Sequence, residues 1–202
     1  MKKVGVLKNN SLLSFSMGLI PALALTSYLG YGLLLALSAF LIVLFISMIL
    51  SSFRDYLETD SMRLPVFFII SGTFITLVEL VLEAVFPSLL AVFGPYLAIL
   101  VVGSLVWGYA VPYSFAHRPK RTFFMALRLG AGYGLAVVFI SFIRDIMGHG
   151  SISFYPFSEM VVELGAARDY RLIVFSVAPG AFFVLAFVSA LFRKFFEKRG
   201  EE

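Results

Sequence analysis

The sequence predicts an all-α integral membrane protein with six transmembrane segments, arranged as two inverted three-helix repeats with broken helices. Of the 202 residues, 60% are hydrophobic and 14% are charged, and the mean hydropathy is +0.97. A soluble domain carries about 25% charged residues. The apolar residues also come in runs near the ~20 residues that cross a bilayer as a helix. The short, alternating segments of a membrane β-barrel are not seen.

The first three apolar segments are expected at residues 12–29, 31–52 and 65–85. The first contains Gly18 and Pro21 and follows two lysines, a layout that also suits a signal peptide. We interpret it as a membrane segment that is kept. The second has no Asp, Glu, Lys, Arg or His, so we interpret it as a wall that faces lipid or a partner. The third is expected to begin at Pro65, because a first helical turn tolerates the missing N–H of proline.

The last three segments are expected at residues 88–111, 123–147 and 172–192. Gly94-Pro95 interrupts the fourth, and Pro179-Gly180 lies within the sixth. Between the fifth and the sixth, Ser158 is a suitable N-cap for a short helix that reaches Ala167. We expect one membrane domain, with repeats at 1–87 and 88–192 and a polar tail at 193–202.

Lysine and arginine are distributed unevenly between the two sides of this arrangement. With six spans, thirteen of the 16 fall on the side of the N-terminus, and three, Arg144, Arg168 and Arg171, fall on the other. Short, positively charged loops stay in the cytoplasm. We therefore expect a multi-pass protein of the cell inner (cytoplasmic) membrane with both the N- and the C-terminus cytoplasmic.

A weak internal repeat underlies the prediction of two halves. The pattern at 30–33, Gly-Tyr-Gly-Leu, recurs at 132–135, and Arg54-Asp55 recurs as Arg144-Asp145. Three spans per half make the halves inverted, an arrangement typical of proteins that move ions or substrates. The alternative is ordinary packing, because glycine and proline are common in membrane helices.

Three ionisable side chains are candidates for an ion pathway: Glu79, Glu83 and Arg128. Glu79 and Glu83 are one helical turn apart in the third segment, so they share a face. A carboxylate in a membrane segment usually faces the protein interior or water. They could bind and release a cation, or simply reach water at the outer end. Arg128 could pair with a carboxylate, or its long side chain could extend to the surface.

Two further pairs are candidates for structural positions. Arg144 and Asp145 end the fifth segment, and adjacent residues do not share a helix face, so their partners are expected elsewhere. They could close the end of the span or act as a gate. Gly103 and Ser104 could mark a broken helix or a close helix crossing.

Several segments, in order, resemble the Rnf/Nqr membrane-subunit family, in its RnfE/NqrD branch. They are found at residues 9–10, 18–24, 63–71, 77–80, 132–134, 142–150 and 178–183. The resemblance implies a subunit of a complex that passes electrons between ferredoxin or NADH and a second acceptor, coupled to sodium or proton movement. It also implies a homologous partner in the opposite orientation, with broken helices whose cysteines hold a 2Fe–2S cluster.

The chain departs from this family at the cysteines, because it has none. The resemblance matches one cysteine site to Ile20, before Pro21, and the other to Ser104, after Gly103. An alkyl group or a hydroxyl does not replace the thiolate or imidazole ligands of such a cluster. We expect the two histidines, His117 and His149, in loops on opposite sides. We therefore expect no metal and no cofactor in this chain, with flavins and iron–sulfur clusters on partner subunits.

The resemblance implies a non-catalytic subunit of an ion-translocating oxidoreductase, which forms part of the Na⁺ or H⁺ path. The alternatives are a stand-alone homodimeric secondary ion transporter and a purely structural anchor. The basic loop with Arg118, Lys120 and Arg121 could reflect orientation alone, or could face an acidic, ferredoxin-like partner. Nothing in the sequence indicates nucleic-acid binding or a soluble enzyme site.

Overall fold

Long helices make up most of this computed structural model, which describes residues 11–12, 17–56, 60–155, 161–163 and 172–197. The longest are α3 (Leu29–Phe53), α4 (Asp60–Val85) and α7 (Pro119–His149); between α4 and α7 lie α5 (Pro87–Val102) and the short α6 (Val111–Ala116). Four helical paths among the described residues are long and apolar enough to cross a bilayer, with α5 and α6 counted as one path. The helical membrane class is therefore confirmed, whereas the six-span, inverted-repeat arrangement stays a prediction.

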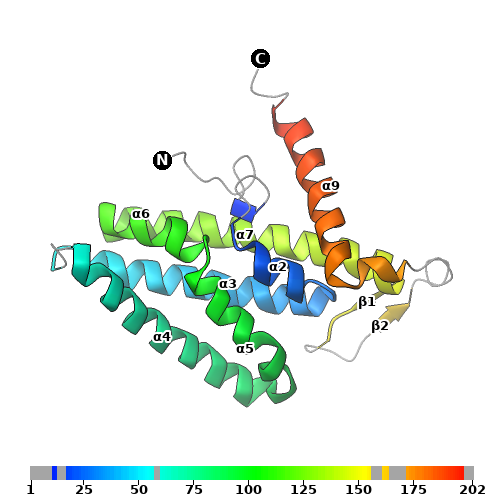
Figure 1. The fold of residues 1–202 in the computed structure, drawn as a ribbon, viewed down its shortest axis with the longest axis horizontal. Helices are drawn as coiled ribbons and strands as arrows, with labels where there is room; N and C mark the ends of the chain where they lie inside the picture. The colour runs from blue at the N-terminus through cyan, green and yellow to red at the C-terminus, as the bar shows by residue number, and fades with distance from the viewer. Residues whose placement is uncertain (1–10, 13–16, 57–59, 156–160, 164–171, 198–202) are drawn as a thin grey trace.

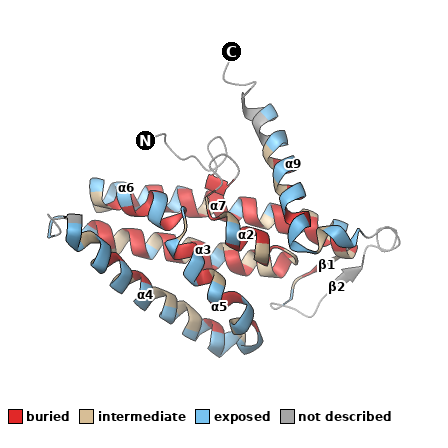
Figure 2. Cartoon of the chain, in the orientation of Figure 1, coloured by how far each residue is buried: buried red, intermediate tan, exposed pale blue. Residues whose placement is uncertain are grey.

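Helices α3 and α7 run antiparallel, side by side, at the centre of the bundle (Figure 1). One face of α3 is buried along its whole length (Figure 2), through residues such as Leu35, Ile42 and Ile46. The interpretation of the second segment as a wall that faces lipid or a partner therefore does not account for this face, which packs within the chain. In a membrane, lipid-facing and protein-facing surfaces are equally apolar, so composition alone does not tell a central helix from a peripheral one.

Small residues explain why α3 and α7 approach so closely. A methyl group added to Gly134 would lie 3.3 Å from the Cβ of Ala36, and one added to Gly130 would lie 2.9 Å from a ring carbon of Phe40. One added to Gly32 would overlap the Ser141 hydroxyl. Small side chains let membrane helices gain contact area that larger ones would prevent.

Helix α4 is the most exposed of the long helices, with 11% of its most apolar 18-residue window buried (Figure 2). It begins at Asp60, so Pro65 lies beyond the first turn and the prediction that the helix starts there is wrong. The residues before Pro65 extend the helix into the polar connection. Most of the outer surface of α4 is available to lipid or to a partner.

The path formed by α5 and α6 is interrupted at Gly103, one of the two candidate places, and not at Gly94-Pro95. Helix α5 continues through Gly94 and Pro95 and ends at Val102. Gly103 then takes an extended conformation, with φ −70° and ψ 173°. A π-helical turn, η1 (Val106–Ala110), follows and leads into α6. A proline removes one hydrogen bond but bends a helix without ending it when neighbours pack around it.

Shorter elements cover the centre and one end of the bundle. Helix α2 (Leu19–Leu25) lies against α3 and α5, and α9 (Ala178–Glu197) leaves the end of α7 and projects from the bundle (Figure 1). The 3₁₀ turn η2 (Ile173–Phe175) precedes α9, so Pro179-Gly180 lies in the first turn of the last helix and not in its middle.

A two-stranded antiparallel sheet lies between α7 and η2. Strand β1 (Ser151–Ser153) pairs with β2 (Val161–Glu163). The short helix expected from Ser158 to Ala167 is therefore wrong at β2, and the rest of that range lies outside the described residues. Val161 and Val162 are β-branched, and β-branched residues favour extended backbone over a helix.

Candidate functional site

The start of α2 and the interruption of the α5–α6 path meet at one junction. Gly18 precedes α2 with φ 67° and is buried. Its N–H donates a hydrogen bond to the Ser104 hydroxyl at 3.3 Å. Its carbonyl accepts one from the Tyr133 hydroxyl at 2.9 Å. Both backbone groups of Gly18 therefore bond to side chains from other segments. The N–H needs such a partner, because the first N–H groups of a helix have no intrahelical acceptor.

Only glycine fits at position 18. A positive φ costs other L-residues about 1–2 kcal/mol. A methyl group there would also lie 2.7 Å from a ring carbon of Tyr133. The fully buried Tyr133 ring thus fills the space beside the break. In the sequence, Tyr133 was noted only as part of the Gly-Tyr-Gly-Leu pattern at 132–135. The signal that could have found it is a phenol in the middle of an apolar span, because a buried phenol needs a polar partner.

The four predicted broken-helix positions lie around this junction. Ile20 is 58% exposed at the start of α2, and Pro21 is buried behind it. Gly103 is half-buried at the end of α5, and Ser104 is exposed beside it. The junction therefore presents an alkyl side chain and a hydroxyl at its open surface, while Pro21 faces the core.

Glu79 and Glu83 lie in a groove between α4 and α5. The groove has a volume of about 400 Å³, and its polar groups are the two carboxylates and the Thr76 hydroxyl. The Glu79 carboxylate rests over Gly94, where an added methyl group would lie 3.5 Å from Oε1. Glu79 is half-buried, and Glu83 is exposed. The structure thus brings the predicted carboxylates to the glycine–proline step of α5.

Arg128 is not brought to this groove. It lies on α7, is exposed, and makes no ion pair among the described residues. Its position two turns into the helix lets the long side chain extend along the surface.

Arg144 is the largest fully buried side chain among the described residues. Its five N–H groups make five hydrogen bonds, and no carboxylate is among the acceptors. The acceptors are the carbonyl oxygens of Leu23, Phe175, Ser176 and Val177 and the hydroxyl of Thr26, at 2.6–3.2 Å. The planar guanidinium is suited to this, because its five donors are fixed in direction. Arg144 thereby joins the end of α2 to the turn before α9.

Asp145 faces a different side of α7 from Arg144 and holds the start of α3. Its Oδ2 accepts hydrogen bonds from the N–H of Leu29 at 3.1 Å and from the N–H of Ser153 at 2.8 Å. A carboxylate at the first turn of a helix satisfies a free N–H and faces the positive end of the helix dipole. His149 Nδ1 lies 3.2 Å from the other oxygen, Oδ1, and Tyr28 stacks on the His149 ring at 4.3 Å. Sequence reasoning missed His149 as a neighbour, although the i, i+4 spacing of Asp145 and His149 indicates it.

Comparison with known proteins places the chain in a family. A family model described as Rnf-Nqr subunit, membrane protein, matches residues 2–189. The chain belongs to the Rnf-Nqr subunit family. The E subunit of an ion-translocating oxidoreductase complex from Methanosarcina acetivorans is 30% identical over 90% of this chain and 84% of its own length. The E subunit of a Na⁺-translocating ferredoxin:NAD⁺ oxidoreductase complex from Acetobacterium woodii is 28% identical over 93% and 91%. The D subunit of a Na⁺-translocating NADH-quinone reductase from Haemophilus ducreyi is 28% identical over 89% and 86%.

The donor groups of this Rnf-Nqr subunit do not fit an iron–sulfur cluster at the matched positions. The chain has no cysteine, so neither Ile20 nor Ser104 offers a thiolate. The Ser104 hydroxyl is already an acceptor for Gly18. Among the described residues there is also no group of three or more His, Asp or Glu side chains placed to hold a metal ion.

Proposed function

We propose that this chain is a membrane subunit of an ion-translocating electron-transport complex of the Rnf/Nqr type. It forms part of the Na⁺ or H⁺ path together with a homologous subunit of inverted topology, and it holds no cluster itself. The observation that carries this proposal is the contact of the two interrupted helices, in which Ser104 accepts the Gly18 N–H. Interrupted helices that meet inside a membrane protein are typical of ion and substrate paths.

The partner is expected on the open side of this junction. Ile20 is 58% exposed and Ser104 is exposed, whereas Tyr133 closes the junction from behind. A second subunit of the same architecture would bring its own interrupted helices to this surface. Because this chain lacks thiolates, the electrons pass through clusters and flavins on partner subunits.

The cation is expected to use the groove of Glu79 and Glu83. Carboxylate and hydroxyl oxygens are ligands that hard cations prefer, and a carboxylate also takes a proton. Pro95, which also lines the groove, has no N–H, so one carbonyl of the preceding turn of α5 lacks its helical partner. The groove combines these oxygens with contact to the surface, which entry and release of an ion both require.

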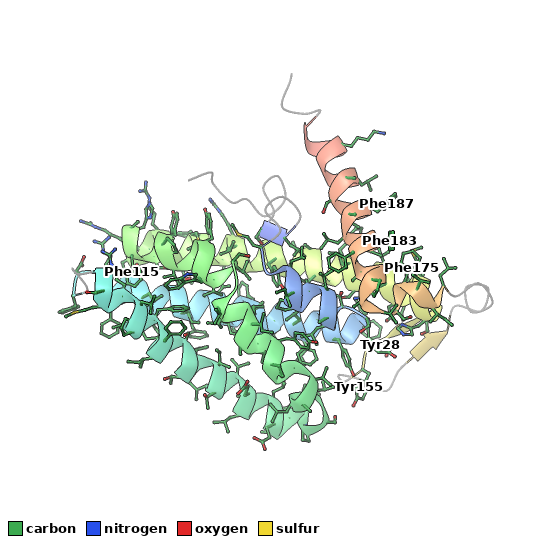
Figure 3. All side chains as sticks on the ribbon, viewed as in Figure 1. Tyr28, Phe115, Tyr155, Phe175, Phe183 and Phe187 are labelled. Carbon is green, nitrogen blue, oxygen red and sulfur yellow. The ribbon has the colours of Figure 1, made fainter. Side chains whose placement is uncertain are left out.

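The orientation follows the positive charges. One end of the bundle holds the basic residues Arg54, Arg118 and Arg121, and Figure 3 labels Phe115 at this end. The other end holds Tyr28 and Tyr155, which are also labelled. We assign the basic end to the cytoplasm. Glu83, near the far end of α4, then lies toward the outer side.

Purification tests the assembly. The tagged chain, extracted in a mild detergent, is expected to co-elute with homologous membrane subunits and with subunits that carry flavin or iron–sulfur absorbance. An Ile20→Trp variant places a bulky ring on the proposed partner surface and should lower the yield of these subunits at least fivefold. Val81→Trp is the matched control, because Val81 is 63% exposed on α4. A lone homodimer that moves an ion in liposomes would instead support a secondary transporter, and equal yields with both variants would contradict the assigned surface.

A further inference from the structure

A basic pocket lies at the end of the bundle where α3 ends and α7 begins. It has a volume of about 380 Å³ and is lined by Arg54, Ala116, His117, Arg118, Lys120 and Arg121. Two connections that are far apart in the sequence, after α3 and between α6 and α7, form it together. Figure 3 shows nitrogen-tipped side chains gathered at this end, near Phe115.

The pocket carries an excess of positive charge. Asp55 lies 3.0 Å from the Arg54 guanidinium, but its own side chain is 75% exposed. No acidic residue lies in the first turn of α7, and its cap residue, Arg118, makes no side-chain capping bond. The positive end of the α7 dipole therefore adds to the charges of Arg118, Lys120 and Arg121. These conditions favour an anion.

Buried hydrogen bonds hold the two walls of the pocket in place. The Ser51 hydroxyl at the end of α3 donates to the carbonyl of His117 at 2.8 Å. The Thr122 hydroxyl in turn donates to Ser51 at 3.1 Å. Both Ser51 and Thr122 are fully buried. The basic side chains thus extend from a preformed backbone, which lowers the cost of ordering them around a ligand.

Exposed apolar side chains lie next to the basic ones, at the end of α3 and on the turns of α7 that follow Lys120. Phe124 is 60% exposed one turn after Lys120, and Leu127 is 38% exposed one turn further on. Phe53 and Tyr56, at the end of α3, are 49% and 82% exposed. Aromatic side chains gather at the level of lipid headgroups. A ligand with a phosphate head and an apolar tail would contact both the basic pocket and the apolar side chains beside it. A soluble anion would contact only the basic pocket.

We propose that this basic pocket binds the phosphate headgroup of an anionic membrane phospholipid, whose acyl chains run along the exposed start of α7. Basic pockets between membrane helices bind acidic lipid headgroups in this manner. The inference does not depend on the redox role of the complex, because it uses only charge, shape and position at the bilayer surface.

Native mass spectrometry of the full chain, released from detergent, tests the proposal. The probes are phosphatidylglycerol and phosphatidylcholine at equal concentrations, followed by inorganic phosphate and by a soluble, acidic ferredoxin. Phosphatidylglycerol is expected to bind more tightly than phosphatidylcholine. Because each Lys or Arg near the surface contributes about a fivefold factor, Lys120→Gln/Arg121→Gln should weaken phosphatidylglycerol binding about 25-fold.

Arg128→Gln/Lys194→Gln is the matched control, because it removes the same charge from exposed residues that do not line the pocket. It should change phosphatidylglycerol binding less than twofold. Equal losses in both double variants would show a general charge effect and overturn the proposal. Binding of inorganic phosphate without preference for phosphatidylglycerol would mean a free anion site, and binding of the ferredoxin in place of lipid would mean a protein-docking surface. Circular dichroism is measured on both variants, and both are expected to keep their helices.

Discussion

The Ser104 hydroxyl accepts the Gly18 N–H at 3.3 Å, although the two residues are 86 positions apart in the chain. One residue lies before a short helix and the other follows the end of a long one. The bond therefore fixes the start of α2 to the interruption of the α5–α6 path. It also gives the Gly18 N–H a partner that an apolar surrounding would not supply. Substitutions at this junction should reveal how much of the fold depends on it.

Gly18→Ala should destabilise the protein. The backbone at position 18 has a positive φ, which alanine disfavours. The new methyl group would also lie 2.7 Å from a ring carbon of Tyr133. We expect a loss of about 2–4 kcal/mol, measured as a lower Tm in detergent. Gly72→Ala is the control: nothing lies within 4 Å of its added methyl group, so alanine should leave the helix α4 unchanged or slightly more stable. A Gly18→Ala protein as stable as wild type would contradict the geometry.

Arg144→Lys should loosen two segments at once. Lysine has three donors, so at least two of the five oxygen atoms around Arg144 would lose their hydrogen bonds. We expect a loss of about 2 kcal/mol or more and faster amide exchange at 23–26 and 175–177. Arg128→Lys, on the exposed surface of the same helix, should change neither. Unaltered exchange in both segments would show that these bonds do not hold them together.

Glu79→Gln should impair ion movement by the assembled complex. The substitution keeps the shape of the side chain over Gly94 but removes the negative charge and the ability to release a proton. We expect ion uptake into liposomes to fall at least tenfold, with assembly unchanged. Asp55→Asn, at the opposite end of the bundle, serves as the control. Wild-type uptake by the Glu79→Gln complex would remove this residue from the ion path.

Single cysteines should report the orientation without background, because the chain has no cysteine of its own. Tyr56 and Tyr155 are 82% and 41% exposed at opposite ends of the bundle. With the basic end in the cytoplasm, a membrane-impermeant maleimide should label Tyr155→Cys in intact spheroplasts and label Tyr56→Cys only after lysis. The reverse pattern would overturn the cytoplasmic assignment of the termini.

The positions of the long helices could be predicted from hydropathy, because apolar runs of span length have few other uses. The expected fifth segment, 123–147, lies within α7, and Gly150 ends that helix with φ 67°. The central place of α3 could not be predicted, since Leu35 and Ile42 are as compatible with lipid as with protein. The family resemblance indicated the interruption at Gly103. The Gly94-Pro95 pair instead predicted a break about two turns earlier, where the helix continues.

The candidate site was only partly predictable, because its contacts join distant segments. The sequence indicates that Arg144 and Asp145 need separate partners, but not that Arg144 binds the turn before α9. It indicates a shared face for Glu79 and Glu83, but not the groove that Gly94 opens beside them. Such pairings depend on how whole helices pack, which local spacing does not encode.

The surroundings of Arg144 set an order of events during biosynthesis. Three of its five acceptors, the carbonyls of Phe175, Ser176 and Val177, are translated 31–33 residues after it. Until those residues are made, three N–H groups of Arg144 lack these acceptors. We therefore expect the end of α7 to reach its final burial together with the docking of the last helix, as a late step in making the protein.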